Sequence, residues 1–171
     1  MENNEINITM VMDIIESYKA TYNKDDISKL SANQWKSVLT FIQVNAGIKA
    51  SRMDTESLES LFSIYEYISN IYDQLITISG FCKFCGLNEN DLYYIFRGAG
   101  ASRESVRLVK NIYKTTEESI VDRLTTAKRN PVGLIATLNH RFGWMNEGVQ
   151  GITTTEERQA LDVSDLPKLS D

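Results

Sequence analysis

Cysteine and histidine are the residue types in this chain that could bind a metal or carry out redox chemistry. Cys82 and Cys85 form a C-x-x-C motif, and His140 is the single histidine. A structural zinc site needs four ligands, and a redox C-x-x-C is expected within a βαβ unit, of which the sequence gives no sign. A buried cysteine outside a disulfide behaves as a small hydrophobic residue. We therefore expect both thiols in the core, with no metal and no cofactor.

The sequence carries no recognisable set of catalytic side chains. Histidine catalysis needs a positioned partner, and no nucleophile motif lies near His140. There is no Walker glycine loop, no paired-carboxylate signature and no nucleophile elbow. At the end of a helix, a histidine is favoured by the nearby carbonyl groups. We therefore expect that the protein is not an enzyme.

A second set of polar residues has the chemistry for contact with DNA. Asparagine can bind adenine through two hydrogen bonds, and basic or hydroxyl side chains can bind phosphate oxygens. Such residues gather at Asn88, Asn90, Tyr93, Tyr94, Arg97, Arg103, Arg107 and Lys110. Glu89 and Asp91 lie among them and would face a polyanion, although carboxylates also stabilise the first turn of a helix. The set predicts DNA contact and leaves a purely structural role open.

The basic residues of the chain are unevenly distributed. The net charge is −5, yet residues 73–144 hold 10 Lys and Arg against 7 Asp and Glu. Arg103, Arg107, Lys110 and Lys114 recur every three or four residues, which places them on one side of a helix. A solvated face is the ordinary explanation, and phosphate contact or an oligomer interface is the alternative. We predict that Arg97, Arg103 and Arg107 supply the electrostatic part of any DNA affinity.

The segment from Ser79 to Ile95 predicts a helix-turn-helix that would position these side chains. Ser79 is expected to cap a short helix, which ends where Gly86 can adopt a left-handed turn. Leu87 follows as a buried turn residue, and Asn88 is expected to cap a second helix. Apolar residues fall where such a unit needs them, at Phe81, Cys85, Leu87, Leu92 and Ile95. This unit often presents its second helix to the DNA major groove.

Periodicity predicts further helices and no strands, so the expected fold class is all-α. The helix expected over residues 55–72 should pack against the helix-turn-helix as its support. The expected organisation is an N-terminal helical extension (1–54), a helix-turn-helix region (55–98), a long-helix and oligomerisation region (99–145), and a flexible acidic tail (146–171). A helical hairpin is the alternative to a single long helix in the third region.

Apolar residues in the third region predict packing between helices or subunits. Ile112 and Ile120 lie on the apolar seam of the long helix expected from about Ser102 to Lys128. A shorter helix starting at Asn130-Pro131 carries more apolar surface than it could leave in water, at Leu134, Leu138, Phe142 and the following Trp144. We expect these side chains to pack on the long helix or on a neighbouring subunit.

Composition favours a folded, helix-rich protein without membrane contact. Hydrophobic residues make up 42% of the 171 residues, and there are two prolines. No apolar run approaches the ~20 residues of a transmembrane helix. The N-terminal residues lack the basic start and apolar stretch of a secretory signal. The expected location is the cytoplasm.

Two blocks of the sequence together resemble the small terminase (DNA-packaging) subunits of tailed bacteriophages and prophages. The first, Ile76-Thr77-Ile78-Ser79-Gly80-Phe81-Cys82 with Gly86-Leu87, is similar to that family's entry into its helix-turn-helix. The second runs from Arg129-Asn130-Pro131 to Phe142-Gly143-Trp144 and resembles the family's closing motif. A long helix of similar length is expected between them, and the resemblance covers about residues 72–145.

The resemblance implies a non-catalytic, ring-forming protein of the bacterial host cytoplasm. Such a protein recognises double-stranded viral DNA and delivers it to the large, ATP-driven terminase subunit. Its implied partners are therefore DNA, the large subunit and further copies of the chain. Two other hypotheses stay open: a helix-turn-helix regulator or replication accessory protein of a mobile element, and a helical protein–protein scaffold without DNA binding.

Overall fold

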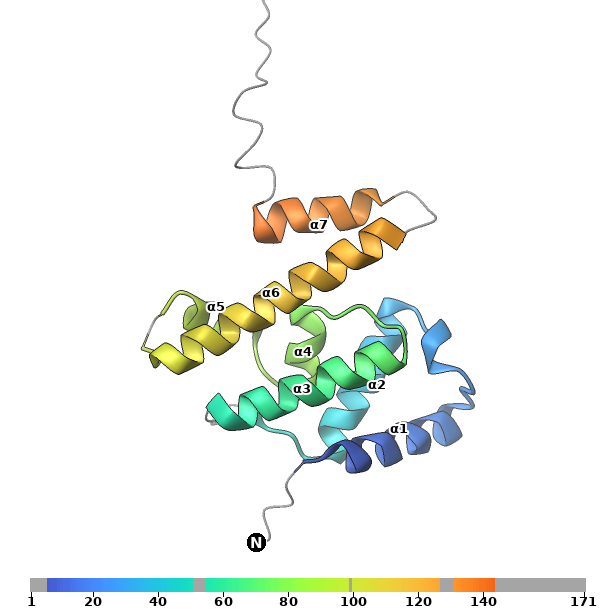
Figure 1. Ribbon diagram of the computed structural model, residues 1–171. Coiled ribbons are helices and arrows are strands. Elements are labelled where there is room, and N and C mark those ends of the chain that lie inside the picture. Colours follow the sequence, from blue (N-terminus) through green and yellow to red (C-terminus); the bar gives the residue numbers. More distant parts are fainter. Residues whose placement is uncertain (1–5, 51–54, 99, 127–130, 144–171) are drawn as a thin grey trace, which may run out of the picture. The chain divides into compact units, whose positions relative to one another are not determined.

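The computed structural model describes residues 6–50, 55–98, 100–126 and 131–143, and these are helical with no strand (Figure 1). The prediction of an all-α fold is confirmed. Within the described residues, the α-helices are α1 (Ile8–Tyr22), α2 (Ala32–Asn45), α3 (Thr55–Ile71), α4 (Ile78–Cys85), α5 (Glu89–Phe96), α6 (Arg103–Thr126) and α7 (Val132–Phe142), with a short 3₁₀ helix η1 (Ile27–Lys29) between α1 and α2. None of the helices in these ranges combines the length and apolar character needed to cross a membrane.

The chain divides into two units, residues 1–128 with α1 to α6 and residues 129–171 with α7. In the second unit, α7 follows Pro131 and ends at Gly143, whose φ of 71° is left-handed. Leu134, Leu138 and Phe142 recur every four residues along it and so share one face. Trp144 and the expected acidic tail lie outside the described residues.

Local sequence signals account for the ends of the early helices. Ser31 and Gln34 form a capping box at the start of α2, as each side chain bonds the backbone N–H of the other. Asn7 caps α1 by accepting a hydrogen bond from the Met10 N–H at 3.0 Å. Asn23 ends that helix in a left-handed conformation. These caps fix where the first two helices begin or end before any tertiary contact is considered.

The first unit has one hydrophobic core, to which α1 to α6 all contribute. Val11 and Ile15 of α1 and Leu39 and Ile42 of α2 are fully buried in the same cluster as the α3 and α4 side chains. Helix α2 packs directly on α4, and α3 packs on α4 as well. Helices α1 and α2 of the predicted N-terminal extension therefore help to hold the helix-turn-helix in place.

The start of α4 differs from the prediction that Ser79 caps it. Thr77 is the cap, since its hydroxyl accepts a hydrogen bond from the Gly80 N–H at 2.9 Å, and Ser79 lies inside the helix. The Tyr65 hydroxyl, buried in α3, accepts from the Thr77 N–H at 3.0 Å and donates to the Thr77 carbonyl oxygen at 3.2 Å. These bonds hold the Thr77 backbone extended and so select it as the cap.

Gly80 is required by the close approach of Tyr65 to α4. A Cβ added at Gly80 would fall on the Tyr65 hydroxyl and lie 2.9 Å from Thr77 Oγ1. We expect Gly80→Ala to lower the free energy of unfolding by about 1–3 kcal/mol, because the extra carbon must displace a hydroxyl that is hydrogen-bonded and buried. Urea denaturation followed by circular dichroism measures this change.

Gly133→Ala is the matched control, because Gly133 lies in α7 with nothing within 4 Å of an added Cβ. Alanine is the better helix former, so this variant should be neutral or slightly stabilising. Equal unfolding free energies for the two variants would contradict the packing of Tyr65 on Gly80.

Both cysteines occupy buried positions of α4, as predicted. Cys82 is 3% exposed and Cys85 is fully buried, and neither is in a disulfide. Burial raises the pKa of the Cys85 thiol well above its usual range. Because the thiolate is the reactive form, both thiols should react with a disulfide reagent only after denaturation. Rapid labelling of the native protein at neutral pH would show that α4 is not packed as described.

Candidate nucleic-acid interface

Aromatic packing anchors α4, the first helix of the helix-turn-helix. Phe81 and Phe84 are fully buried and pack on the aromatic rings of α3. The Phe81 ring centre lies 5.1 Å from that of Phe62 and 5.7 Å from that of Tyr65, and the Phe84 ring lies 5.9 Å from Tyr65. The prediction that the third helix supports the helix-turn-helix is confirmed.

The turn after α4 sets the direction of α5. Gly86 has a φ of 68°, and its N–H donates to the Cys82 carbonyl oxygen, so α4 ends there as predicted. The Asn88 side-chain oxygen accepts from the Asn90 N–H at 3.0 Å and caps α5, also as predicted. Leu87 is partly buried, Leu92 of α5 is buried in the core, and Ile95 and Phe96 pack against the same core. Because Leu92 faces inward, the opposite face of α5 is exposed to solvent.

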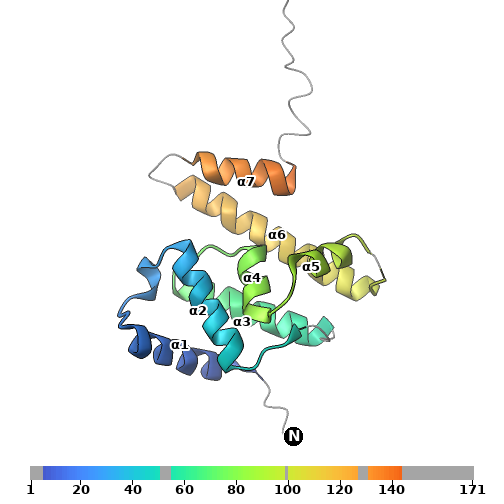
Figure 2. The same cartoon turned by 180° about the vertical axis from the view of Figure 1, so that it is seen from behind.

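Helix α5 lies beside the N-terminal half of α6 (Figure 2). The Phe96 ring of α5 packs on the Tyr113 ring of α6, with their centres 4.6 Å apart. Gly98 and Gly100 in the connection both have positive φ, which glycine adopts without strain. This connection brings the start of α6 next to the end of α5.

The two helices and the caps of α5 carry the side chains that the sequence predicts for DNA contact. These side chains are exposed, namely Asn88, Asn90, Tyr93, Tyr94, Arg97, Arg103, Arg107 and Lys110. Tyr93 and Tyr94 are 46% and 60% exposed. Ile112, on the opposite side of α6, is buried in the core, and Ile120 lies further along the same helix. We call the exposed face of α5 with the first half of α6 the α5–α6 surface.

The cations of this surface are not equivalent. Arg107 lines a cavity of about 310 Å³ together with Glu56 and Glu59 of α3 and Glu104 of α6. Three carboxylates that line the same cavity as one guanidinium reduce the positive potential there. Arg97, Arg103 and Lys110 lie outside this cavity lining. The arrangement leaves Arg107 the weakest candidate for a phosphate contact.

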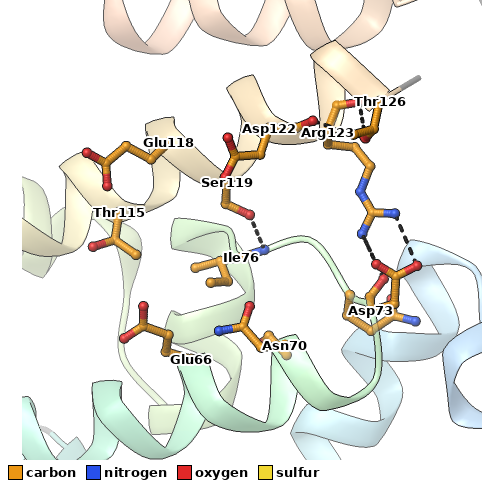
Figure 3. Close-up of a pocket in the computed structure, with 12 residues that line it drawn as sticks. Glu66, Asn70, Asp73, Ile76, Thr115, Glu118, Ser119, Asp122, Arg123 and Thr126 are labelled. Atoms are coloured by element: carbon orange, nitrogen blue, oxygen red, sulfur yellow. Dashed lines mark hydrogen bonds and ion pairs between the residues drawn. The ribbon is translucent and has the colours of Figure 1, made fainter.

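The charge reverses along α6. A cavity of about 500 Å³ lies between α3 and the C-terminal half of α6, and Figure 3 shows carboxylates at its edges, among them Glu66, Glu118 and Asp122. Arg123 is paired with Asp73 at 3.0 Å. The described residues contain no group of acidic, cysteine or histidine side chains suited to a metal ion. The carboxylates of this cavity would repel a polyanion.

Two hydrogen bonds distinguish the polar side chains of the α5–α6 surface from one another. The Asn88 oxygen is engaged in the cap, so Asn90 is the asparagine of α5 whose side chain is directed to solvent. The Arg97 guanidinium donates a hydrogen bond to the Tyr93 hydroxyl at 3.1 Å. The spacing of Tyr93 and Arg97 by one helical turn is the sequence signal for that pair.

Comparison of the chain with models of protein families, with curated proteins and with solved structures gives no match.

Proposed function

We propose that this protein binds double-stranded DNA through the α5–α6 surface, as a non-catalytic adaptor of the small terminase type. The observation that supports this most is the gathering of exposed basic and hydrogen-bonding side chains on two adjacent helices. The first of these helices is the second helix of a helix-turn-helix, whose position suits entry into a DNA groove. Phosphates would be bound by the cations, and Asn90 offers an amide for a base edge.

The proposal includes assembly and partners in the bacterial cytoplasm. Further copies of the chain and the large terminase subunit are the proposed protein partners. Helix α7 presents apolar side chains for the contact between copies, with Ile135 41% and Val132 61% exposed. Exposed apolar side chains gathered on one helix favour a protein contact.

The proposal is tested by measuring affinity for a short mixed-sequence duplex by fluorescence anisotropy at several salt concentrations. We expect the logarithm of the association constant to fall linearly with the logarithm of the salt concentration. The slope should be about −0.9 for each phosphate contacted. Native mass spectrometry of the same sample counts the subunits: a ring supports packaging and a dimer supports the regulator. Absence of binding at low salt would contradict any DNA-binding function.

A protein–protein scaffold is the second candidate function. Glu89 and Asp91 in the first turn of α5 oppose a polyanion, and the exposed Tyr93, Tyr94 and Arg97 are residue types that dominate protein interfaces. Under this alternative, Tyr94→Ala would abolish binding to a protein partner. Addition of duplex DNA at low salt would leave the tryptophan and tyrosine fluorescence of the protein unchanged.

A further inference from the structure

Tyr93 and Arg97 form an ordered pair at the C-terminal end of α5. Arg97 Nη1 donates to the Tyr93 hydroxyl at 3.1 Å, and the Arg97 Cζ lies 5.7 Å from the centre of the Tyr93 ring. The Arg97 N–H also donates to the Tyr93 carbonyl oxygen at 3.0 Å. The hydrogen bond and the ring contact hold the guanidinium end of the Arg97 side chain, and the backbone bond keeps Arg97 one helical turn after Tyr93.

The same end of α5 favours a cation and limits its movement. The last carbonyls of a helix carry partial negative charge, which favours a basic residue at that end. Gly98 follows with a φ of 79°, so the chain turns away directly after Arg97. The Tyr93 hydroxyl occupies one edge of the Arg97 guanidinium. The other N–H groups of the guanidinium keep the geometry that matches two oxygens of a phosphate.

We propose that Tyr93 is a positioning residue, which holds the Arg97 guanidinium ready to bind a DNA phosphate. A long side chain that is already ordered loses less rotamer freedom when its ligand binds. Tyr93 thus strengthens binding without touching the DNA. The identity of the ligand rests on the proposed function, whereas the ordering of Arg97 is a property of the unbound protein.

The first test measures duplex binding by Tyr93→Phe, Arg97→Ala and the double variant. Tyr93→Phe keeps every charge, so we expect affinity to fall about two- to tenfold, as for one lost hydrogen bond, with no change in salt dependence. Arg97→Ala should lower the salt slope by about 0.9. Adding Tyr93→Phe to Arg97→Ala should change nothing further, because its partner is gone. Equal losses in both backgrounds, or no loss in either, would overturn the positioning role.

Tyr94→Phe is the matched control, because Tyr94 is the neighbouring exposed tyrosine and has Gly98 rather than arginine one turn later. Any effect of Tyr94→Phe should be the same whether residue 97 is arginine or alanine. If the effect of Tyr94→Phe depended on Arg97 as strongly as the effect of Tyr93→Phe does, the positioning role of Tyr93 would also be overturned.

The second test needs no DNA. Nitrogen relaxation of the Arg97 side-chain Nε–H should report restricted motion in the wild-type protein and faster motion in Tyr93→Phe. Arg103, on the same surface, serves as the internal reference. An Arg97 as mobile as Arg103 in both proteins would overturn the positioning role alone. Failure of the wild-type protein to bind any duplex would instead overturn the proposed function.

Discussion

The variant with alanine at Arg97, Arg103 and Lys110 is expected to bind duplex DNA roughly 10²–10³-fold more weakly than the wild type near 0.1 M salt. Each of these exposed side chains would contact one phosphate, and each lost contact should reduce the salt slope by about 0.9. The three losses together should flatten the slope by about 2.7. Fluorescence anisotropy over a series of salt concentrations measures both quantities.

The matched control replaces Lys24, Lys29 and Lys36 with alanine. It removes the same number of positive charges from η1, α2 and the segment between α1 and η1, and none from α5 or α6. Arg107→Ala provides a second comparison, and it should weaken binding less than Arg103→Ala because three carboxylates share its cavity. If both triple variants lose the same affinity, net charge and not this surface governs binding.

Phe81→Ala is expected to lower the free energy of unfolding by about 3–5 kcal/mol. Phe81 is fully buried, and its ring packs on Phe62 and Tyr65 at the point where α3 supports α4. Removing the ring leaves a cavity that the surrounding helices can fill only in part. For a domain stabilised by about 5–15 kcal/mol, this loss is a large part of the total. Urea denaturation followed by circular dichroism at 222 nm measures it.

Tyr67→Ala in α3 is the control for Phe81→Ala, since Tyr67 is 49% exposed and its loss should change stability by about 0.5 kcal/mol or less. Because α4 positions α5, the Phe81→Ala protein should also bind DNA only in proportion to its folded fraction. A loss below about 1 kcal/mol would contradict the packing of α4 on α3.

Features that depend on neighbours in the sequence could be predicted from the sequence. The capping box of Ser31 and Gln34, the left-handed turn at Gly86 and the cap at Asn88 each join residues at most four positions apart. The burial of Cys82 and Cys85 could also be predicted, because it follows from the spacing of apolar residues within the helix-turn-helix. These elements place the second helix and expose its polar face.

Features that depend on contacts between distant residues could not be predicted. Thr77 rather than Ser79 caps α4 because the hydroxyl of Tyr65, from another helix, holds the Thr77 backbone. The carboxylates that line the Arg107 cavity include Glu56 and Glu59, which α3 brings to the start of α6. Spacing along α6 alone makes Arg103 and Arg107 look equivalent, and only the packing of α3 separates them.

Site-specific photocrosslinking tests most directly whether the α5–α6 surface binds DNA. A photoreactive benzophenone amino acid would replace one of three exposed tyrosines, Tyr94 of α5, Tyr67 of α3 or Tyr22 of α1, whose exposures of 60%, 49% and 53% are comparable. After irradiation with a labelled duplex, we predict a crosslink from position 94 and none from positions 67 or 22. Crosslinks from position 67 or 22 without one from position 94 would contradict the proposed interface.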